Sequence, residues 1–298
     1  MKIIVCFSGG KDSQACLIKA CRDFGSTNVE AVFCDTEWEH ELTYQHIDYV
    51  VQSLGCKFTK LHSNIGGFRE LCIRMKWFPD SMHRMCTTQL KIWPMIDYIL
   101  TLNEDVTIIQ GIRSAESAKR AKMACSGDYF EQYFKDASER GRLYKVKEVK
   151  EWCKKHHAWV ERPMFGYSAQ DIINFILDAG QEPNPLYKKG FSRVGCYPCI
   201  YAKLSDIKSM RKDEKYIARV LELETLVNER REKEMINGTK ASLLPKGKIP
   251  ARFCHRYGKG IPSFGDVIEY VSRDDANLDL FEDNDQYSCM SIYHGLCE

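Results

Sequence analysis

Short apolar segments alternate with segments of helical periodicity along the first 110 residues. The apolar segments lie at residues 2–7, 29–33 and 106–110, and a further strand is predicted at residues 56–61. Apolar residues recur with helical spacing between these segments, from Ala15 to Cys21, from Leu42 to Leu54 and from Met95 to Leu100. This alternation predicts an α/β fold, a twisted parallel sheet with helices on both faces. Ligands of such sheets bind at the carboxyl ends of the strands.

The remaining two thirds of the chain show a looser pattern. A capped helix is predicted at residues 168–180, and a strongly charged helix at residues 213–236. The predicted packed side of the charged helix carries Ile217, Val220, Leu221 and Val227. The acidic stretch at residues 274–285 is predicted to be a solvated surface segment.

Composition is that of an ordinary globular protein, with 44% hydrophobic and 28% charged residues among 298. The apolar stretch at residues 2–7 is too short for a secretory signal, and no window reaches the roughly 18 apolar residues of a membrane span. We therefore expect a cytoplasmic protein without a membrane partner. The formal net charge of +2 argues neither for nor against a polyanionic partner.

A glycine loop follows the first predicted strand and precedes the first predicted helix. Its sequence is Ser8-Gly9-Gly10-Lys11-Asp12-Ser13. Glycines let a backbone approach an anion closely, and a helix N-terminus offers free amides and a positive dipole. The loop thus predicts a phosphate site; the alternative is a tight turn in which Asp12 or Ser13 caps the helix.

Fourteen cysteines are many for a reducing compartment, which favours metal or redox chemistry over a disulfide framework. Four of them lie in apolar periodic segments and are interpreted as core residues: Cys6, Cys16, Cys21 and Cys34. Cys196 and Cys199 are different, because their C-x-x-C spacing allows two thiolates to hold one metal ion or cluster. A structural zinc site would need a second such pair, which the chain lacks.

The glycine loop resembles the pyrophosphate loop of the N-type ATP pyrophosphatases. Further segments resemble the phosphoadenosine phosphosulfate (PAPS) reductase family of that superfamily, in the same order. They are Cys34-Asp35-Thr36-Glu37 with Thr43-Tyr44, Arg84-Met85-Cys86-Thr87 with Leu90-Lys91, Gly111-Ile112-Arg113 with Glu116-Ser117 and Arg120-Ala121, and Asn184-Pro185-Leu186-Tyr187 with Gly190-Phe191 and Gly195-Cys196-Tyr197-Pro198-Cys199. The resemblance covers about residues 1–205.

This resemblance implies an adenine nucleotide, ATP or the sulfonucleotides PAPS and APS, at the carboxyl edge of the sheet. The implied nucleotide-binding residues are Ser8, Gly9, Gly10, Lys11, Asp12, Ser13, Asp35, Thr36, Gly111, Arg113, Glu116 and Arg120. The implied catalytic residues are Lys11, Asp12, Lys91 and Arg113. Asp12 would help to hold Mg²⁺ if ATP is the substrate, with a helix-capping role as the competing interpretation. For the arginines, the competing interpretation is a surface salt bridge.

The resemblance also favours an iron–sulfur cluster, [4Fe–4S], over zinc. Its implied ligands are Cys86, Cys196 and Cys199, with Cys297 as the fourth. Family members often carry a cysteine pair where this chain has Met85-Cys86, so the fourth ligand is not fixed. Cys289 or Cys254 could replace Cys297, or one iron has an open coordination position. The implied organisation is a nucleotide-binding domain at residues 1–125, the rest of the family domain with the metal loop at 126–205, and a helical or irregular region at 206–298.

Two enzymatic reactions and one binding function follow from these features. The intact glycine loop favours splitting of ATP to AMP and pyrophosphate, which would activate an acceptor for sulfur transfer, with a nucleic acid or a small molecule as acceptor and a protein as electron or sulfur donor. The first alternative is a PAPS or APS reductase that releases sulfite, although the family's Glu-Cys-Gly-Leu-His signature is missing. The second is a non-catalytic iron–sulfur sensor of nucleotides or nucleic acids, to which a basic patch would contribute. That patch comprises Lys203, Lys208, Arg211 and Lys212.

Overall fold

The structure, a computed structural model, describes the chain except residues 81–82, 119, 136–142, 238–248, 255–261 and 274–298. The predicted acidic surface segment and the candidate ligands Cys289 and Cys297 therefore lie outside the described residues. Among the helices described, none is long and apolar enough to cross a membrane.

A six-stranded sheet with the order β3-β2-β1-β4-β6-β5 forms the centre of the molecule. The strands are β1 (Lys2–Cys6), β2 (Val29–Asp35), β3 (Lys57–His62), β4 (Val106–Gln110), β5 (Ser126–Asp128) and β6 (Ala158–Glu161). All neighbouring strands are parallel except β5, which pairs antiparallel with β6. The α/β fold and the four expected strands are confirmed, with bounds that differ by up to two residues. Because β5 and β6 follow residue 125, the sheet continues past the boundary placed there from the sequence.

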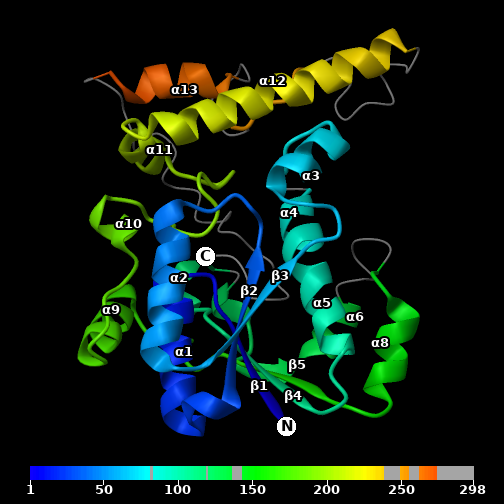
Figure 1. Cartoon of the computed structure of the whole chain (residues 1–298), viewed down its shortest axis with the longest axis vertical. Coiled ribbons are helices and arrows are strands. Elements are labelled where there is room, and N and C mark those ends of the chain that lie inside the picture. The colour runs from blue at the N-terminus through cyan, green and yellow to red at the C-terminus, as the bar shows by residue number, and fades with distance from the viewer. Residues whose placement is uncertain (81–82, 119, 136–142, 238–248, 255–261, 274–298) are drawn as a thin grey trace.

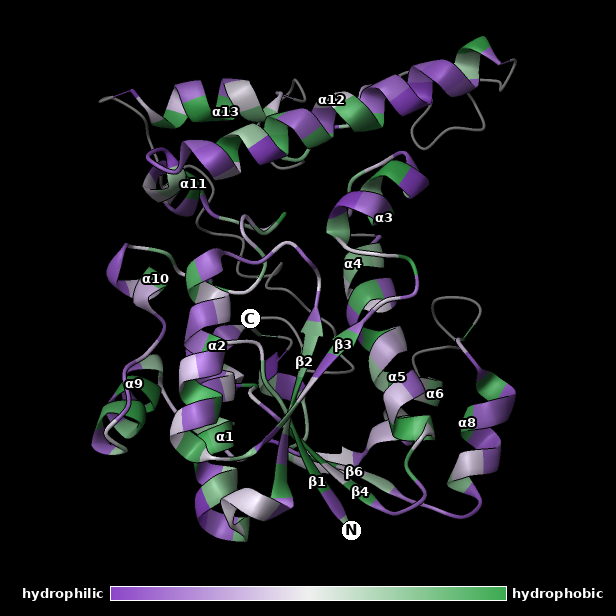
Figure 2. Cartoon of the chain, in the orientation of Figure 1, coloured by the Kyte–Doolittle hydropathy of each residue, from purple (hydrophilic) through white to green (hydrophobic). Residues whose placement is uncertain are grey.

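Helices cover both faces of the sheet (Figure 1). One face carries α1 (Lys11–Phe24), α2 (Glu41–Leu54) and α9 (Ala169–Asp178), and the other carries α5 (Trp93–Leu100), α6 (Tyr129–Lys135) and α8 (Val146–Cys153). Residues of β1 alternate between the two apolar cores: Val5 packs toward the α1 side, whereas Ile4 and Cys6 pack toward the α5 side. The central strands β1, β2 and β4 are largely hydrophobic, whereas the edge strand β3 and the covering helices are of mixed polarity (Figure 2).

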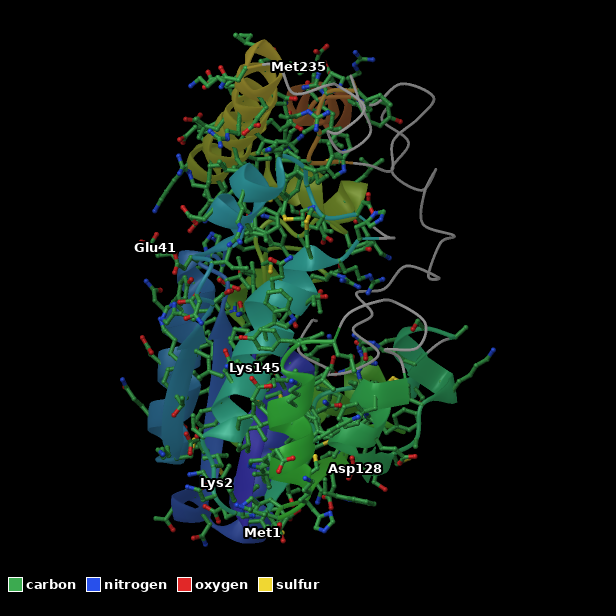
Figure 3. All side chains as sticks on the ribbon, turned by 90° about the vertical axis from the view of Figure 1, so that its right-hand side faces the viewer. Met1, Lys2, Glu41, Asp128, Lys145 and Met235 are labelled. Carbon is green, nitrogen blue, oxygen red and sulfur yellow. The ribbon has the colours of Figure 1, made fainter. Side chains whose placement is uncertain are left out.

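A further helical layer lies beyond the carboxyl ends of the strands (Figure 1). It contains α3 (Phe68–Met75), α10 (Pro185–Lys188), α11 (Leu204–Met210), α12 (Glu214–Ile236) and α13 (Phe264–Val271). Met235, near the end of α12, lies at the end of the molecule opposite to Met1 and Lys2 (Figure 3). Short segments complete the described elements: α4 (Met85–Thr87), a π-helical segment (Thr88–Ile92) and 3-10 turns at Ser26–Asn28, Ser114–Glu116 and Arg120–Lys122.

The predicted charged helix is confirmed as α12, with one error in its packed side. Val220 and Val227 are buried, but Leu221 is 37% exposed, and Leu223 is buried in its place. Val220, Leu223 and Val227 follow the i, i+3, i+7 spacing of one helix face, and Leu221 lies outside that face. The cysteines expected in the core, Cys6, Cys16, Cys21 and Cys34, are all buried.

Glu30 of β2 connects four elements on the side of the sheet that faces α5. Its carboxylate lies 2.5 Å from Lys2 Nζ and 3.1 Å from Lys57 Nζ, and it accepts hydrogen bonds from Tyr98 (2.6 Å) and Thr59. Burial alone would raise the pKa of Glu30, but these partners lower it to about 2 from an ordinary value of 4.5. The ionised carboxylate therefore stabilises the fold.

We expect Glu30→Gln to lower the free energy of unfolding at pH 7 by about 2 kcal/mol, because a lowered folded-state pKa stabilises the protein above the unfolded-state pKa. In the unmodified protein this contribution is lost as the pH falls from about 4.5 to about 2. Urea unfolding at several pH values measures both effects. The exposed Glu151→Gln serves as control and should leave stability unchanged; equal pH profiles for Glu30→Gln and the unmodified chain would contradict the assignment.

Candidate nucleotide-binding site

The predicted site residues come from three loops at one edge of the sheet. β1 lies between β2 and β4 and is parallel to both. The loop after β1 therefore lies between the loop that follows β2 and the loop that follows β4 (Figure 1). This is the edge at which parallel α/β sheets bind ligands.

The glycine loop presents backbone amides at the start of α1. Gly9 has a φ of +80°, which favours glycine, and Gly10 is the residue before the first turn of α1. The amides of Gly9 and Gly10 have no hydrogen-bond acceptor within the described part of the chain. Amides of this kind at a helix N-terminus are suited to binding phosphate oxygens.

The helix-cap interpretation of the loop finds no support in this geometry. The N-cap position of α1 is occupied by Gly10, which has no side chain to cap the helix, and neither Asp12 nor Ser13 stands at that position. Ser13 Oγ instead donates to Gly10 O at 2.9 Å and accepts from Ser8 N at 3.3 Å. These bonds hold the loop in its turn.

Gly111, at the end of β4, lies directly against the first turn of α1. A Cβ at this position would be 2.6 Å from Ser13 N and 2.8 Å from the carbonyl carbon of Asp12. Both atoms belong to the backbone, so neither can rotate away. Glycine is therefore required for the loops after β1 and β4 to meet.

This close approach brings Arg113 to Asp12. Arg113 Nε lies 2.5 Å from Asp12 Oδ1, and Lys11 Nζ lies 3.4 Å from Asp12 Oδ2. Asp12 is fully buried and Arg113 is 6% exposed, so the pair is not a surface salt bridge. With two cations beside it, Asp12 is suited to orienting Lys11 and Arg113, and its role as a Mg²⁺ ligand stays a prediction.

Arg120 belongs to the same network through Glu116. One oxygen of Glu116 accepts from the Arg113 amide at 2.8 Å and from the Arg120 guanidinium. Arg120 is 3% exposed, and the pair with Glu116 is again largely buried. The structure thus brings Lys11, Arg113 and Arg120 to one side of the loop.

The loop after β2 contributes a second group of buried polar side chains. Asp35 Oδ1 accepts from the Glu37 amide (2.8 Å) and from Tyr44 (2.7 Å). Burial would raise the pKa of Asp35, but these hydrogen bonds and the nearby Lys60 hold it below its usual value. Asp35 is therefore ionised at neutral pH and already engaged by its own loop.

Glu39 lies deeper in the same loop. Its carboxylate accepts from the Thr36 hydroxyl (2.7 Å), the Trp38 amide (3.0 Å) and Tyr44 (3.1 Å). Burial raises the pKa of Glu39 above its usual value, a rise that Lys91 and the Thr36 hydroxyl oppose. A carboxylate with a raised pKa at the edge of a cleft is suited to proton transfer.

A narrow cleft joins these groups to the glycine loop. It is lined by Cys6, Phe7, Ser8, Phe33, Cys34, Glu39, Lys91 and Gly195. Lys91 is 6% exposed and lies in the π-helical segment, a conformation common at functional sites. The wall of the cleft therefore combines Ser8 of the glycine loop with the carboxyl group of Glu39 and the ammonium group of Lys91.

The C-x-x-C loop packs against the residues that follow β2. Tyr197 N donates to Trp38 O at 2.7 Å, and the Trp38 indole donates to Pro198 O at 3.2 Å. Glu39 and Cys196 form an isolated antiparallel bridge, and Cys196 Sγ lies 4.0 Å from Glu39 Oε1. Cys196 is therefore directly beside the cleft.

The predicted cluster ligands do not form a metal centre among the residues described. Cys86, Cys196 and Cys254 pack in or against one apolar core, and Cys199 Sγ accepts from the Tyr201 amide at 3.4 Å. Within the described ranges, no three His, Cys, Asp or Glu side chains are arranged to hold a metal ion. Cys254 is buried, and burial raises the pKa of its thiol. The described residues thus show no assembled site for the implied cluster, and Cys289 and Cys297 lie outside them, so the cluster stays a prediction.

A segment from late in the chain covers the glycine loop. Asn184 Nδ2 donates to Gly9 O at 3.1 Å, and the Tyr187 hydroxyl accepts from Lys11 N at 3.1 Å. The Lys11 ammonium lies 5.1 Å from the centroid of the Tyr187 ring. A Cβ on Gly9 would be 3.0 Å from Thr43 and Ile47 side-chain atoms, so α2 closes the loop from another side.

The geometry defines an α/β protein with a glycine loop after its first strand whose amides are suited to binding an anion. The sequence model of the phosphoadenosine phosphosulfate reductase domain matches residues 2–202, and the chain belongs to this family. Membership supports a nucleotide-binding, sulfonucleotide-related function and enzymatic activity.

Two curated relatives resemble the chain in sequence. A 37.8 kDa protein from the gpa 5′ region of Escherichia phage 186 is 28% identical, with 99% of this chain and 96% of the relative covered. A protein of Methanocaldococcus jannaschii is 27% identical over 212 residues, which are 71% of this chain and 38% of the relative. The chain thus spans well under half of the archaeal protein.

Two solved structures resemble the chain more distantly. A PAPS reductase from Candida auris, in complex with phosphate, has a TM-score of 0.44 at 11% identity and covers 66% of this chain and 81% of its own. An FMN adenylyltransferase from Candida glabrata has a TM-score of 0.39 at 12% identity and covers 65% of this chain and 52% of its own.

Three residues at the site had no assigned role from the sequence: Glu39, Asn184 and Tyr187. Asn184 and Tyr187 belong to the Asn-Pro-Leu-Tyr segment. Only the match of this segment to the family's sequence motifs could have marked them as site residues. Glu39 follows the second-strand motif by three residues, but one acidic side chain among Glu37, Glu39 and Glu41 could not be singled out. Burial distinguishes it, since Glu37 and Glu41 are exposed.

We expect Gly111→Ala to lower the free energy of unfolding by about 2 kcal/mol, because its Cβ would force the β4 loop away from the α1 backbone. Binding of a non-hydrolysable ATP analogue should weaken at the same time, because Arg113 moves with this loop. Urea unfolding and calorimetric titration measure the two effects. Gly166→Ala is the matched control, since a Cβ there meets nothing within 4 Å; equal losses in both variants would refute the close-approach argument.

Proposed function

We propose that the protein binds ATP at the glycine loop, splits it to AMP and pyrophosphate, and thereby adenylates an acceptor for sulfur transfer. The observation that carries this proposal is the pair of unengaged amides at Gly9 and Gly10, with Lys11 and Arg113 beside them, at the start of α1. Family membership supports the adenine nucleotide. The intact Ser-Gly-Gly-Lys-Asp-Ser sequence supports ATP over a sulfonucleotide.

In the proposed reaction the acceptor attacks the α-phosphate in line with the leaving pyrophosphate. The amides of the loop and the Lys11 ammonium hold the pyrophosphate, whose negative charge grows as the bond to the α-phosphate breaks. Arg113 is held by Asp12, so its position does not depend on the substrate. Positioning and charge neutralisation by these groups supply the catalysis.

Glu39 is the proposed general base of this reaction. It faces the cleft with Lys91 and Ser8, and burial raises the pKa of its carboxyl group. An acceptor hydroxyl, amine or thiol loses a proton as it attacks phosphorus, and Glu39 would accept that proton. The Thr36 hydroxyl and the Trp38 amide keep the carboxylate in place.

The iron–sulfur cluster remains part of the proposal without a role in these steps. Two of its candidate ligands, Cys289 and Cys297, lie outside the described residues, and the described cysteines are not assembled around a metal ion. The proposed steps at the α-phosphate require only the loop, its cations and Glu39.

Lys11→Ala should abolish pyrophosphate release from ATP, because it removes the ammonium group beside the phosphate loop. The measurement is an enzyme-coupled pyrophosphate assay with candidate acceptors, in the presence of Mg²⁺. Lys19→Ala on the same helix is the control, since Lys19 is half-exposed and pairs with Asp23. Sulfite release from PAPS or APS with a reductant, and no use of ATP, would establish a reductase instead.

Glu39→Gln should lower the turnover number about 100-fold or more while leaving ATP affinity unchanged, because the amide cannot accept a proton. The rate of the unmodified enzyme should rise with pH as Glu39 ionises, and the variant should lose this rise. Steady-state kinetics from pH 5 to 9 test both statements. Glu37→Gln, an exposed neighbour that pairs with His62, is the control; an unchanged pH profile in Glu39→Gln would exclude the role.

A further inference from the structure

The segment from residue 185 to residue 215 concentrates positive charge. It carries eight Lys and Arg residues and three acidic residues, whereas the whole chain has a net charge of +2. The rest of the chain is therefore net acidic. The eight cations are Lys188, Lys189, Arg193, Lys203, Lys208, Arg211, Lys212 and Lys215. We call the exposed part of this segment the basic surface.

Two of the three acidic residues in the segment accept hydrogen bonds from other residues of the segment. Asp206 is 4% exposed and accepts from Ser192 N (2.7 Å), Ser192 Oγ (2.9 Å) and Lys203 N (3.1 Å). Asp213 accepts from the Tyr197 hydroxyl at 2.5 Å. These carboxylates anchor the backbone and do not pair with the surface cations.

Most of the cations likewise have no carboxylate partner. Lys188 pairs with Glu182 and Lys215 with Glu41, both exposed pairs. Within the described ranges, five others form no ion pair: Lys189, Lys203, Lys208, Arg211 and Lys212. Lys208 is half-buried and the other four are exposed. Long side chains of one sign without counter-charges favour a polyanionic partner.

The cations lie on one side of the molecule and adjoin the cleft. A Cβ on Gly190 would be 3.1 Å from Ser209 Oγ, so the end of α10 touches α11. Both helices lie on the side of α2 in Figure 1, opposite to α8. The same segment supplies Gly195 to the wall of the cleft and Cys196 beside Glu39.

We propose that the basic surface binds the phosphodiester backbone of a nucleic acid, which is the acceptor of the proposed reaction. Only the assignment of the nucleic acid as acceptor rests on the proposed function; binding to the basic surface does not. A chain of phosphates spaced along the surface would be held by the unpaired cations, and a nucleotide at its end would reach the cleft past Gly195. Phosphate contacts of this kind supply affinity without sequence readout.

The test is fluorescence anisotropy with labelled single-stranded DNA and RNA oligonucleotides of one sequence, titrated with the full-length protein at several salt concentrations. Affinity should fall steeply with salt, with a slope of about 0.7 per phosphate contact for single strands. Lys208→Gln, Arg211→Gln and Lys212→Gln combined should weaken binding at least tenfold and reduce the slope by about 2. Comparison of the DNA and RNA titrations shows which of the two nucleic acids the basic surface prefers.

The matched control is Lys147→Gln, Lys150→Gln and Lys155→Gln combined, three exposed lysines on and after α8. It should bind like the unmodified protein, and circular dichroism verifies the folding of both triple variants. Absence of binding, salt-independent binding, equal losses in both triple variants, or binding of polyglutamate as tight as that of the oligonucleotides would overturn the inference. Lys11→Ala should still bind oligonucleotide, so a failure of pyrophosphate release alone refutes the proposed function and leaves this binding surface standing.

Discussion

The contact between Gly111 and the first turn of α1 determines the geometry of the whole site. Because glycine has no Cβ, the end of β4 can lie against the backbone of Asp12 and Ser13. This approach places Arg113 2.5 Å from Asp12 and, through Glu116, fixes Arg120. Two arginines that would otherwise be flexible surface side chains are thus buried and oriented beside the glycine loop. Preorganised cations of this kind need no rearrangement when phosphate charge develops.

Much of the fold and the position of the site could be predicted from the sequence. The buried strands are continuous apolar runs, and the glycine loop stands at a strand-to-helix junction, so strand order in the chain already placed three loops at one edge. β5 and β6 could not be predicted, because they contain only three and four residues. The alternation of buried and exposed residues in β6 is too short to indicate a strand. Leu221 was wrongly assigned to the packed side of α12. On a long charged helix, the sequence does not show whether an apolar residue next to the buried face points toward the core or toward solvent.

The pairings inside the site were less accessible to sequence reasoning. Lys11, Arg113 and Arg120 were named as anion binders, yet the pairing of Arg113 with Asp12 joins residues 101 positions apart in the chain. Asp12 illustrates the difficulty: its position after the glycine pair fits a metal ligand, a helix cap or an ion-pair partner equally well. The ion pair is seen only in the structure, through the burial of Asp12 and its 2.5 Å distance to Arg113. Glu39 was missed for the same reason, since its environment sets its chemistry.

The glycine loop is completed by Asn184, a residue that lies far from it in the sequence. Its side-chain amide donates to Gly9 O and lies 3.4 Å from Thr43 Oγ1, and its side-chain oxygen accepts from the Leu186 amide. The strand, loop and helix that present the phosphate-binding amides are complete within the first 24 residues, but the clamp that closes over them is synthesised 160 residues later. A ribosome must therefore have released most of the family domain before the loop takes its final form. An early chain fragment would carry the motif without the binding site.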